Sequence, residues 1–160
     1  MAFHPGGAFA YVLEELGSAI AVYRYDAVRG ALVWMQTLST LPPDFDGPNQ
    51  TAELRIHPSG RFAYATNRGH NSVAVFAIDP IRGRLESVGW EPTRGDWPRG
   101  MNIDPSGTFL YVANQNSDNI VIFRIDGTSG RLALTDAVVQ TPTPSDIEFG
   151  PDVSIAAAAR

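Results

Sequence analysis

The sequence predicts an all-β protein built from repeated four-stranded antiparallel sheets, and three observations predict it. A pattern that fills residues 4–32 recurs without a gap at residues 57–85 and 104–132. Within each copy the apolar residues alternate, as in "RFAYATN" and "SVAVFAID", which is typical of strands rather than helices. Turn sequences such as "HPSG" and "DPIRG" recur at matching places between the strands. Repeats of about 45–50 residues with this content are typical of the blades of a β-propeller.

The elements of each repeat follow one another in a fixed order. A first strand, such as "AELRI" or "GMNI", leads to an opening residue, which is His4, His57 or Asp104. A turn with Pro and Gly follows, and then the second and third strands. A second turn ends in a glycine that is free to take positive φ, and a fourth strand such as "RLESVGW" completes the blade. We expect His4 and His57 to act in the turns, because Asp replaces them in the third copy.

The repeats also predict the interior. Asn67 and Asn114 stand at the ends of second strands, where we expect them to cap the strand by bonding nearby backbone. Trp97 lies beside a fourth strand and is expected to pack rather than to contact a ligand. The side chains expected to be buried between blades are Phe62, Tyr64, Val75 and Phe76, with their equivalents in the other copies.

The chain does not hold enough repeats for a complete ring. The predicted blades lie at about residues 1–50, 51–98 and 99–144, with the start of a further blade at 145–155. This is about three and a half blades, whereas propellers close with roughly four to eight. An open arc exposes strand edges and apolar blade faces. The sequence therefore predicts part of a ring, which we expect to self-associate or to join the missing N-terminal blades.

Composition and charge exclude several classes of function. The 160 residues carry a formal net charge of −5 and no basic run, so we expect no nucleic-acid partner and no membrane partner. No cysteine is present, which excludes disulfides, thiolate catalysis and cysteine-based zinc sites. No apolar stretch reaches ~18 residues, and "MAFHPGG" lacks the features of a signal peptide, so the expected location is cytoplasmic. Asp44 and Asp46 resemble a calcium loop only weakly and are expected to be solvated.

One position does not repeat, although it lies at the same distance from each opening residue. It holds Glu15, Arg68 and Gln115. A structural position would keep one residue type, whereas a site that lines a shared channel needs a different group from each blade. We therefore predict a functional site here, and the alternative is that Glu15 and Arg68 are solvated loop residues. His70 could touch the same ligand, but an exposed turn histidine is an equally good interpretation.

The stretches "NRGHNSVAVFAIDPIRGRL" and "DPSGTFLYVANQNSDNIVIFRID" resemble the seven-bladed propeller lactonase family. The namesake of that family is the bacterial propeller-type 6-phosphogluconolactonase, and a carboxymuconate-lactonising enzyme is related to it. The resemblance runs from about residue 2 to residue 149 and places the chain in the C-terminal half, because "PTPSDIEF" resembles a segment near the family's C-terminus. It implies a presumed ring of seven blades, hydrolysis of a sugar lactone, and neither a metal nor an organic cofactor.

The resemblance also implies site residues. "LEEL" is similar to the family's acidic "NEL" motif, which indicates Glu15, or Glu14 if the motif is displaced by one place. "NRGH" matches the family's basic motif, which indicates Arg68. We expect Arg68 to bind the substrate's phosphate or carboxylate, or to stabilise the oxyanion formed when water attacks the lactone. Glu15 is the expected general base for that water, and His70 and Gln115 are expected to bind substrate.

Two further site residues of the family, an Arg in "GPRH" and a histidine of an earlier blade, would fall before residue 1. Arg99 in "PRGM" is similar, but it is not at the family's catalytic position. The predicted function is hydrolysis of 6-phosphogluconolactone to 6-phosphogluconate in the pentose phosphate pathway, with an incomplete site in this chain. The alternatives are a non-catalytic binding or scaffold propeller fragment and a muconate-type cycloisomerase.

Overall fold

The structure is a computed structural model that describes residues 1–150. Its strands form three four-stranded antiparallel sheets, each in chain order, which we call blades 1, 2 and 3. Blade 1 consists of β1 (Ala2–Phe3), β2 (Phe9–Glu14), β3 (Ala19–Asp26) and β4 (Ala31–Ser39). Blade 2 consists of β5 (Gln50–Ile56), β6 (Phe62–Arg68), β7 (Ser72–Ile78) and β8 (Leu85–Pro92). Blade 3 consists of β9 (Pro98–Ile103), β10 (Phe109–Asn114), β11 (Asn119–Ile125) and β12 (Leu132–Gln140).

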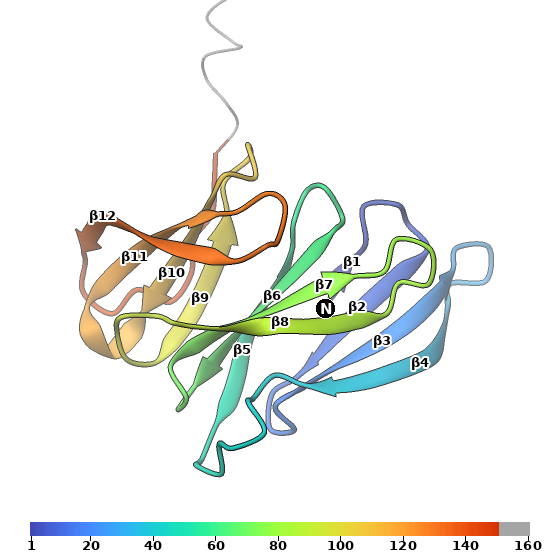
Figure 1. Cartoon of the computed structure of the whole chain (residues 1–160), viewed down its shortest axis with the longest axis horizontal. Helices are drawn as coiled ribbons and strands as arrows, with labels where there is room; N and C mark the ends of the chain where they lie inside the picture. The colour runs from blue at the N-terminus through green and yellow to red at the C-terminus, as the bar shows by residue number, and fades with distance from the viewer. Residues whose placement is uncertain (151–160) are drawn as a thin grey trace, which may run out of the picture.

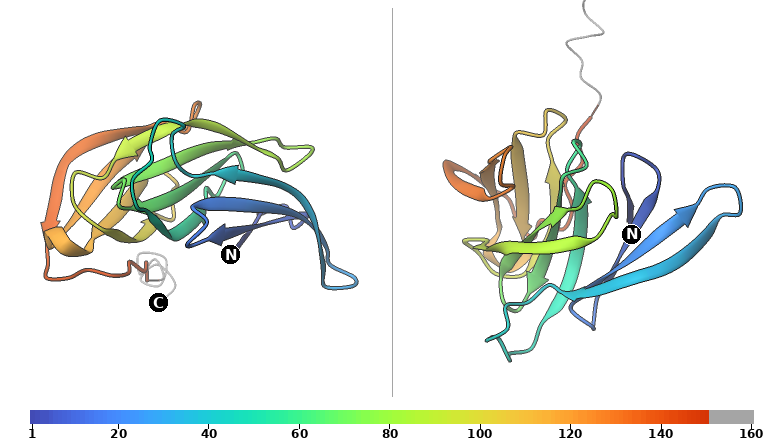
Figure 2. Two further views of the ribbon diagram at one scale, coloured as in Figure 1. Left: turned by 90° about the horizontal axis from the view of Figure 1, so that it is seen from below. Right: turned by 45° about the vertical axis from the view of Figure 1, so that its right-hand side comes forward.

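The prediction of an all-β fold made of four-stranded blades is confirmed. The described residues hold one 3₁₀ turn, η1 (Gln115–Ser117), besides the strands. The blades stand side by side in chain order, with blade 2 between the other two (Figures 1 and 2). Strand β5 contacts β1 and β2 on one side and β9 on the other, so the first strands of the blades line one side of the arc. Within residues 1–150 no helix is long and apolar enough to cross a membrane.

The chain beyond β12 returns to the first strand of blade 3. The side-chain nitrogen of Asn102 donates a hydrogen bond to the carbonyl oxygen of Ile147 at 2.8 Å. The ring of Phe149 packs edge-on against Tyr111, with centroids 5.2 Å apart. Residues 145–150 therefore lie beside β9, where the first strand of a further blade would stand. Residues 151–155 of that predicted blade lie outside the described residues.

Matching contacts join blade 1 to blade 2 and blade 2 to blade 3. The Tyr11 hydroxyl donates to the carbonyl oxygen of Gly83 at 3.1 Å, and the Tyr64 hydroxyl donates to Gly130 at 3.0 Å. A methyl group added at Gly83 would meet the Phe9 ring at 2.3 Å, and one at Gly130 would meet Phe62 at 2.4 Å. Both glycines also have positive φ, at 65° and 74°. Glycine is therefore required at each position for two reasons. The turn needs positive φ, and a side chain would clash with the Phe ring of the preceding blade.

The two turn histidines also take part in these junctions. His4 Nε2 bonds the carbonyl oxygen of Gly60 at 3.0 Å, and His57 Nε2 bonds that of Gly107 at 2.8 Å. Both glycines belong to the corresponding turn of the next blade. The sequence indicated a role in the turn, and the structure adds a contact across the junction.

The predicted interior is confirmed for blade 2, whereas its equivalents Tyr23, Phe109, Tyr111 and Ile122 in the other blades are only partly buried. The exposed fractions are 4% for Phe62, 3% for Val75 and zero for Tyr64 and Phe76. Asn67 and Asn114 are buried and cap strand ends as expected, but the backbone they bond belongs to the preceding blade. Their side-chain nitrogens donate to the carbonyl oxygens of Thr40 at 2.8 Å and Thr93 at 3.1 Å.

Candidate active site

A hollow of about 560 Å³ lies where strand ends of the three blades meet. Charged side chains of both signs line it. The basic ones come from β5, β6 and β9, and the acidic ones from the turn after β2, from β5 and from the segment after β12. Its charged side chains are Glu15, Glu53, Arg55, Arg68, Arg99 and Asp146.

Glu15 and Arg68 meet in this hollow. Glu15 Oε1 accepts a hydrogen bond from Arg68 Nη2 at 2.6 Å, although 53 residues separate the two in sequence. The first strand of blade 2 bridges them through Thr51, whose carbonyl oxygen accepts from Arg68 Nη2 at 2.7 Å. The Thr51 amide in turn donates to the backbone carbonyl of Glu15 at 3.0 Å. Two blade ends and the strand between them therefore hold the pair.

The Arg68 guanidinium has a hydrogen-bond donor that no described residue uses. Its side chain is only 9% exposed, whereas that of Glu15 is 62% exposed. The guanidinium lies 5.4 Å from the centre of the Trp97 ring, a cation–π contact. Its Nε is buried and has no hydrogen-bond partner among the described residues. A buried donor without a partner costs free energy, so an anionic ligand that reached this group would gain a strong charge-assisted contact.

The structure selects Glu15 over Glu14 as the carboxylate beside Arg68. The Glu14 side chain is exposed and bends back toward Gly17 in its own turn, where a Cβ on the glycine would meet Oε2 at 2.9 Å. Its contribution to the site is structural, because its backbone carbonyl accepts from the Thr51 hydroxyl at 3.1 Å.

His70 and Gln115 occupy different places. His70 does not line the hollow: its Nδ1 bonds the Ser72 hydroxyl at 2.7 Å, and its ring packs edge-on against Phe45 at 4.7 Å. Gln115 lies in η1, and its Oε1 accepts from Arg99 Nη1 at 3.5 Å, so it reaches a lining residue without lining the hollow itself. The structure thus brings Glu15 and Arg68 together, sets Gln115 at the margin and leaves His70 outside.

Sequence reasoning missed Glu53 and Arg55, which project from the first strand of blade 2 into the hollow. The Glu53 carboxylate accepts hydrogen bonds from the Leu54 amide and from Arg55. Burial raises the pKa of Glu53, and the nearby Arg55 guanidinium lowers it by less. A usable signal was present, because "AELRI" carries two charges on a strand that should face the middle of the ring.

Irregular strand pairing sets the positions of two residues that line the hollow, Glu53 on β5 and Arg99 on β9. Thr51 pairs with Asn67 and Leu54 pairs with Ala65, so Ala52 and Glu53 together oppose the single residue between them. Arg99 is the extra residue at the corresponding place of β9. Such bulges re-aim side chains and are over-represented next to active sites. The sequence gives no sign of them, because strand register is a tertiary property.

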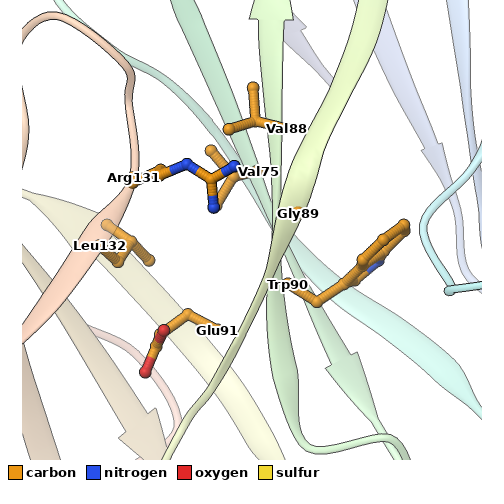
Figure 3. A pocket seen from close by; sticks show the side chains of 7 residues that line it. All are labelled: Val75, Val88, Gly89, Trp90, Glu91, Arg131 and Leu132. Carbon is orange, nitrogen blue, oxygen red and sulfur yellow. The ribbon is translucent and has the colours of Figure 1, made fainter.

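Among the described residues, no group of three or more His, Asp or Glu side chains could hold a metal ion. A smaller cavity of about 80 Å³ lies between blades 2 and 3 (Figure 3). Val75, Val88, Gly89 and Leu132 line it together with the Arg131 side chain, which points toward Val75 in Figure 3. The Glu91 carboxylate at its border is paired with Arg94 at 2.9 Å. Figure 3 shows the Trp90 ring on the other side of β8. This cavity lies in the packing between two blades, whereas the larger hollow gathers more charged side chains.

A family profile described as "Lactonase, 7-bladed beta-propeller" matches residues 1–149. The chain belongs to this lactonase family. The 6-phosphogluconolactonase of Bacillus subtilis (strain 168) is 37% identical over 99 residues, which cover 62% of this chain and 28% of that protein. The 6-phosphogluconolactonase of Pectobacterium carotovorum subsp. carotovorum (strain PC1) is 39% identical over 103 residues, 64% of this chain and 31% of that protein.

A solved structure agrees with the arrangement of the blades. The periplasmic gluconolactonase PpgL of Pseudomonas aeruginosa matches with a TM-score of 0.88 and 36% identity, over 92% of this chain and 41% of that chain. The family resemblance noted from the sequence is thereby confirmed. The chain spans less than a third of the two curated relatives, at 28% and 31% of their lengths.

Proposed function

We propose that this chain supplies part of the active site of a sugar-lactone hydrolase, with 6-phosphogluconolactone as the substrate and 6-phosphogluconate as the product. The observation that carries the proposal is the meeting of Glu15 with a buried, incompletely bonded Arg68 in a charged hollow. The names of the relatives from Bacillus and Pectobacterium support the choice of substrate.

The proposed reaction is the addition of water to the lactone carbonyl. A carboxylate of the hollow takes a proton from water, and the oxygen of that water bonds to the carbonyl carbon. Arg68 stabilises the negative charge that develops on the carbonyl oxygen or holds the substrate's phosphate. The ring C–O bond then breaks, and the leaving oxygen receives the proton back. Glu15 and Glu53 are the two glutamates that line the hollow, and Gln115 remains proposed as a substrate contact through its bond to Arg99.

The rest of the ring completes the site in this proposal. The family closes with seven blades, and three complete blades lie within residues 1–150. The resemblance implies that an Arg and a His from earlier blades face Glu15 and Arg68. Without them the lactone lacks part of its positioning, which typically contributes several orders of magnitude in rate. We therefore expect the chain alone to hydrolyse lactone near background and to self-associate through its uncovered blade faces.

We also propose a cytoplasmic location for the protein. The resemblance implies the cytoplasm, whereas the solved Pseudomonas relative is described as periplasmic.

The test compares hydrolysis of 6-phosphogluconolactone above the spontaneous rate by the chain alone and by the chain mixed with the N-terminal blades of its Bacillus relative. We expect activity in the mixture, a large loss in Arg68→Ala and none in Arg82→Ala, whose side chain is 74% exposed in a turn. A mixture that binds lactone without turnover would favour a scaffold role. Turnover of a muconate but not of a gluconolactone would favour the cycloisomerase.

A further inference from the structure

We propose that Glu53, rather than Glu15, accepts the proton from the attacking water, and that Glu15 positions Arg68. This inference rests on the proposed lactone hydrolysis and assigns its base. The two carboxylates line the same hollow but are held in different ways.

Glu15 is committed to Arg68. Its Oε1 accepts from the guanidinium at 2.6 Å, and Arg68 has a second fixed acceptor in the Thr51 carbonyl at 2.7 Å. The negative charge of Glu15 is matched by this partner, and 62% of its side chain is exposed to water. Such a group orients a guanidinium well, and transfer of a proton to it would break the ion pair that holds Arg68. Glu53 is also ion-paired, but with Arg55, which is held by Asn102 as well.

Glu53 is shielded from water to a greater degree. Its side chain is 25% exposed, and the pairing irregularity of β5 places it in the hollow. Its backbone is fixed there, because the Glu53 amide donates to the Thr66 hydroxyl at 2.9 Å. Among described residues only Oε1 accepts hydrogen bonds, from the Leu54 amide and from Arg55. Oε2 is therefore available to a water molecule.

Burial raises the pKa of Glu53 by more than the Arg55 guanidinium lowers it. Arg55, its partner on the same strand, also donates to Asn102 Oδ1 at 3.1 Å and lies 3.9 Å from Glu148, so its charge serves two carboxylates. Asp146, on the segment after β12, raises the pKa of Glu53, and the amino group of Met1 lowers it slightly. Burial is the largest influence and raises this pKa. Arg68, Arg99 and Glu15 complete the charged lining of the hollow.

The Glu53 carboxylate takes one proton from water, and the water oxygen forms a bond to the lactone carbonyl carbon while the carbonyl electron pair moves to oxygen near Arg68. The carbonyl then reforms, the ring ester bond breaks, and the leaving alkoxide takes the proton from the Glu53 carboxylic acid. The product is the hydroxy acid, which ionises in water, and Glu53 is again a carboxylate.

The first experiment is a carbon-13 titration of the glutamate side-chain carboxyls in the full chain, with Glu53→Gln and Glu15→Gln used for assignment. We expect the Glu53 carboxyl to titrate above the usual range of a glutamate, because burial raises its pKa. A Glu53 carboxyl that titrates at or below the usual range would overturn the assignment of the base even if the chain takes part in lactone hydrolysis.

The second experiment measures the pH dependence of lactone hydrolysis with the form of the protein that is active in the preceding assay. The ionised carboxylate is the base, so the wild-type rate should rise with pH through the pKa of Glu53. We expect Glu53→Gln to lower kcat by about 100-fold or more, with KM within about twofold, and to remove this rise. Glu53→Asp should retain part of the activity, and Glu86→Gln, an exposed change on β8, should change nothing.

Glu15→Gln should instead raise KM and keep the rise with pH, because it loosens Arg68 but leaves the base in place. A Glu53→Gln protein with wild-type kcat and pH profile would overturn the inference alone. A mixture of the wild-type chain with the N-terminal blades that shows no hydrolysis above the spontaneous rate would overturn the proposed function, and the base assignment with it.

Discussion

The blade junctions and the hollow are built from the same repeat, but they use its positions in opposite ways. At the junctions, Tyr11 and Tyr64 make the same hydrogen bond to a glycine of the next blade, at 3.1 and 3.0 Å. At the hollow, one repeat position holds Glu15 in the first copy and Arg68 in the second, and these two different residues bond each other. A contact that recurs at every junction keeps its residues, whereas a site shared by blades needs complementary groups.

The third blade sharpens this comparison. Phe62 is 4% exposed against Gly130 of the next blade, whereas the equivalent Phe109 has no such glycine among the described residues and is partly exposed. Tyr111 likewise makes no hydroxyl hydrogen bond within residues 1–150 and packs against Phe149 instead. The same residue type therefore differs in burial and in hydrogen bonding between copies, which allows matched tests within one chain.

The largest expected effect is the loss of a junction ring. Phe62→Ala should lower the free energy of unfolding by roughly 3–5 kcal/mol, as for other buried aromatic residues, because its ring fills the space over Gly130. Chemical denaturation followed by circular dichroism measures the change. Phe109→Ala is the control and should cost less than half as much. Equal losses would show that the junction does not distinguish the two copies.

A large effect is also expected for a substitution in the hollow, but on the rate of lactone hydrolysis rather than on the free energy of unfolding. Arg68→Ala should lower the rate of lactone hydrolysis by about 10²–10³-fold, the usual effect of removing one group that stabilises an oxyanion. The melting temperature should change much less than in Phe62→Ala. A variant that loses stability without a specific loss of rate would place Arg68 among the structural residues and remove it from the site.

A smaller effect is expected from a single junction hydrogen bond. Tyr64→Phe leaves the buried carbonyl of Gly130 without its partner, which should cost about 1–3 kcal/mol of unfolding free energy. Burial also raises the pKa of the Tyr64 phenol, so it is neutral and able to donate throughout the physiological range. Tyr111→Phe serves as the comparison and should be nearly neutral in the same denaturation experiment.

The smallest effect concerns a turn. Backbone hydrogen bonds from Ser129 and Thr128 and the Ser129 hydroxyl hold the pKa of Asp126 below its usual 3.8. Its stabilising contribution is thus fully present above that value and is lost as pH falls through the lowered pKa. Asp126→Asn should lower the melting temperature slightly at pH 7 and by less at pH 2–3, whereas exposed Asp136→Asn should behave like wild type. A pH-independent difference would contradict the proposed turn contact.

The sequence by itself determined the blades, the residues buried in them and the position where chemistry was to be sought. Alternation places Phe62 and Phe76 inside, and the exchange of Glu15 for Arg68 at one repeat position indicates a candidate site, because both signals depend on residue types and spacing alone. Tertiary structure decided which candidates meet. Glu15 rather than Glu14 reaches Arg68, and His70 turns toward Ser72, since a one-residue difference at a strand end changes the direction of a side chain. Only the pairing of β5 with β6 brings Glu53 into the hollow, because a bulge arises from two strands together and leaves no mark on either sequence.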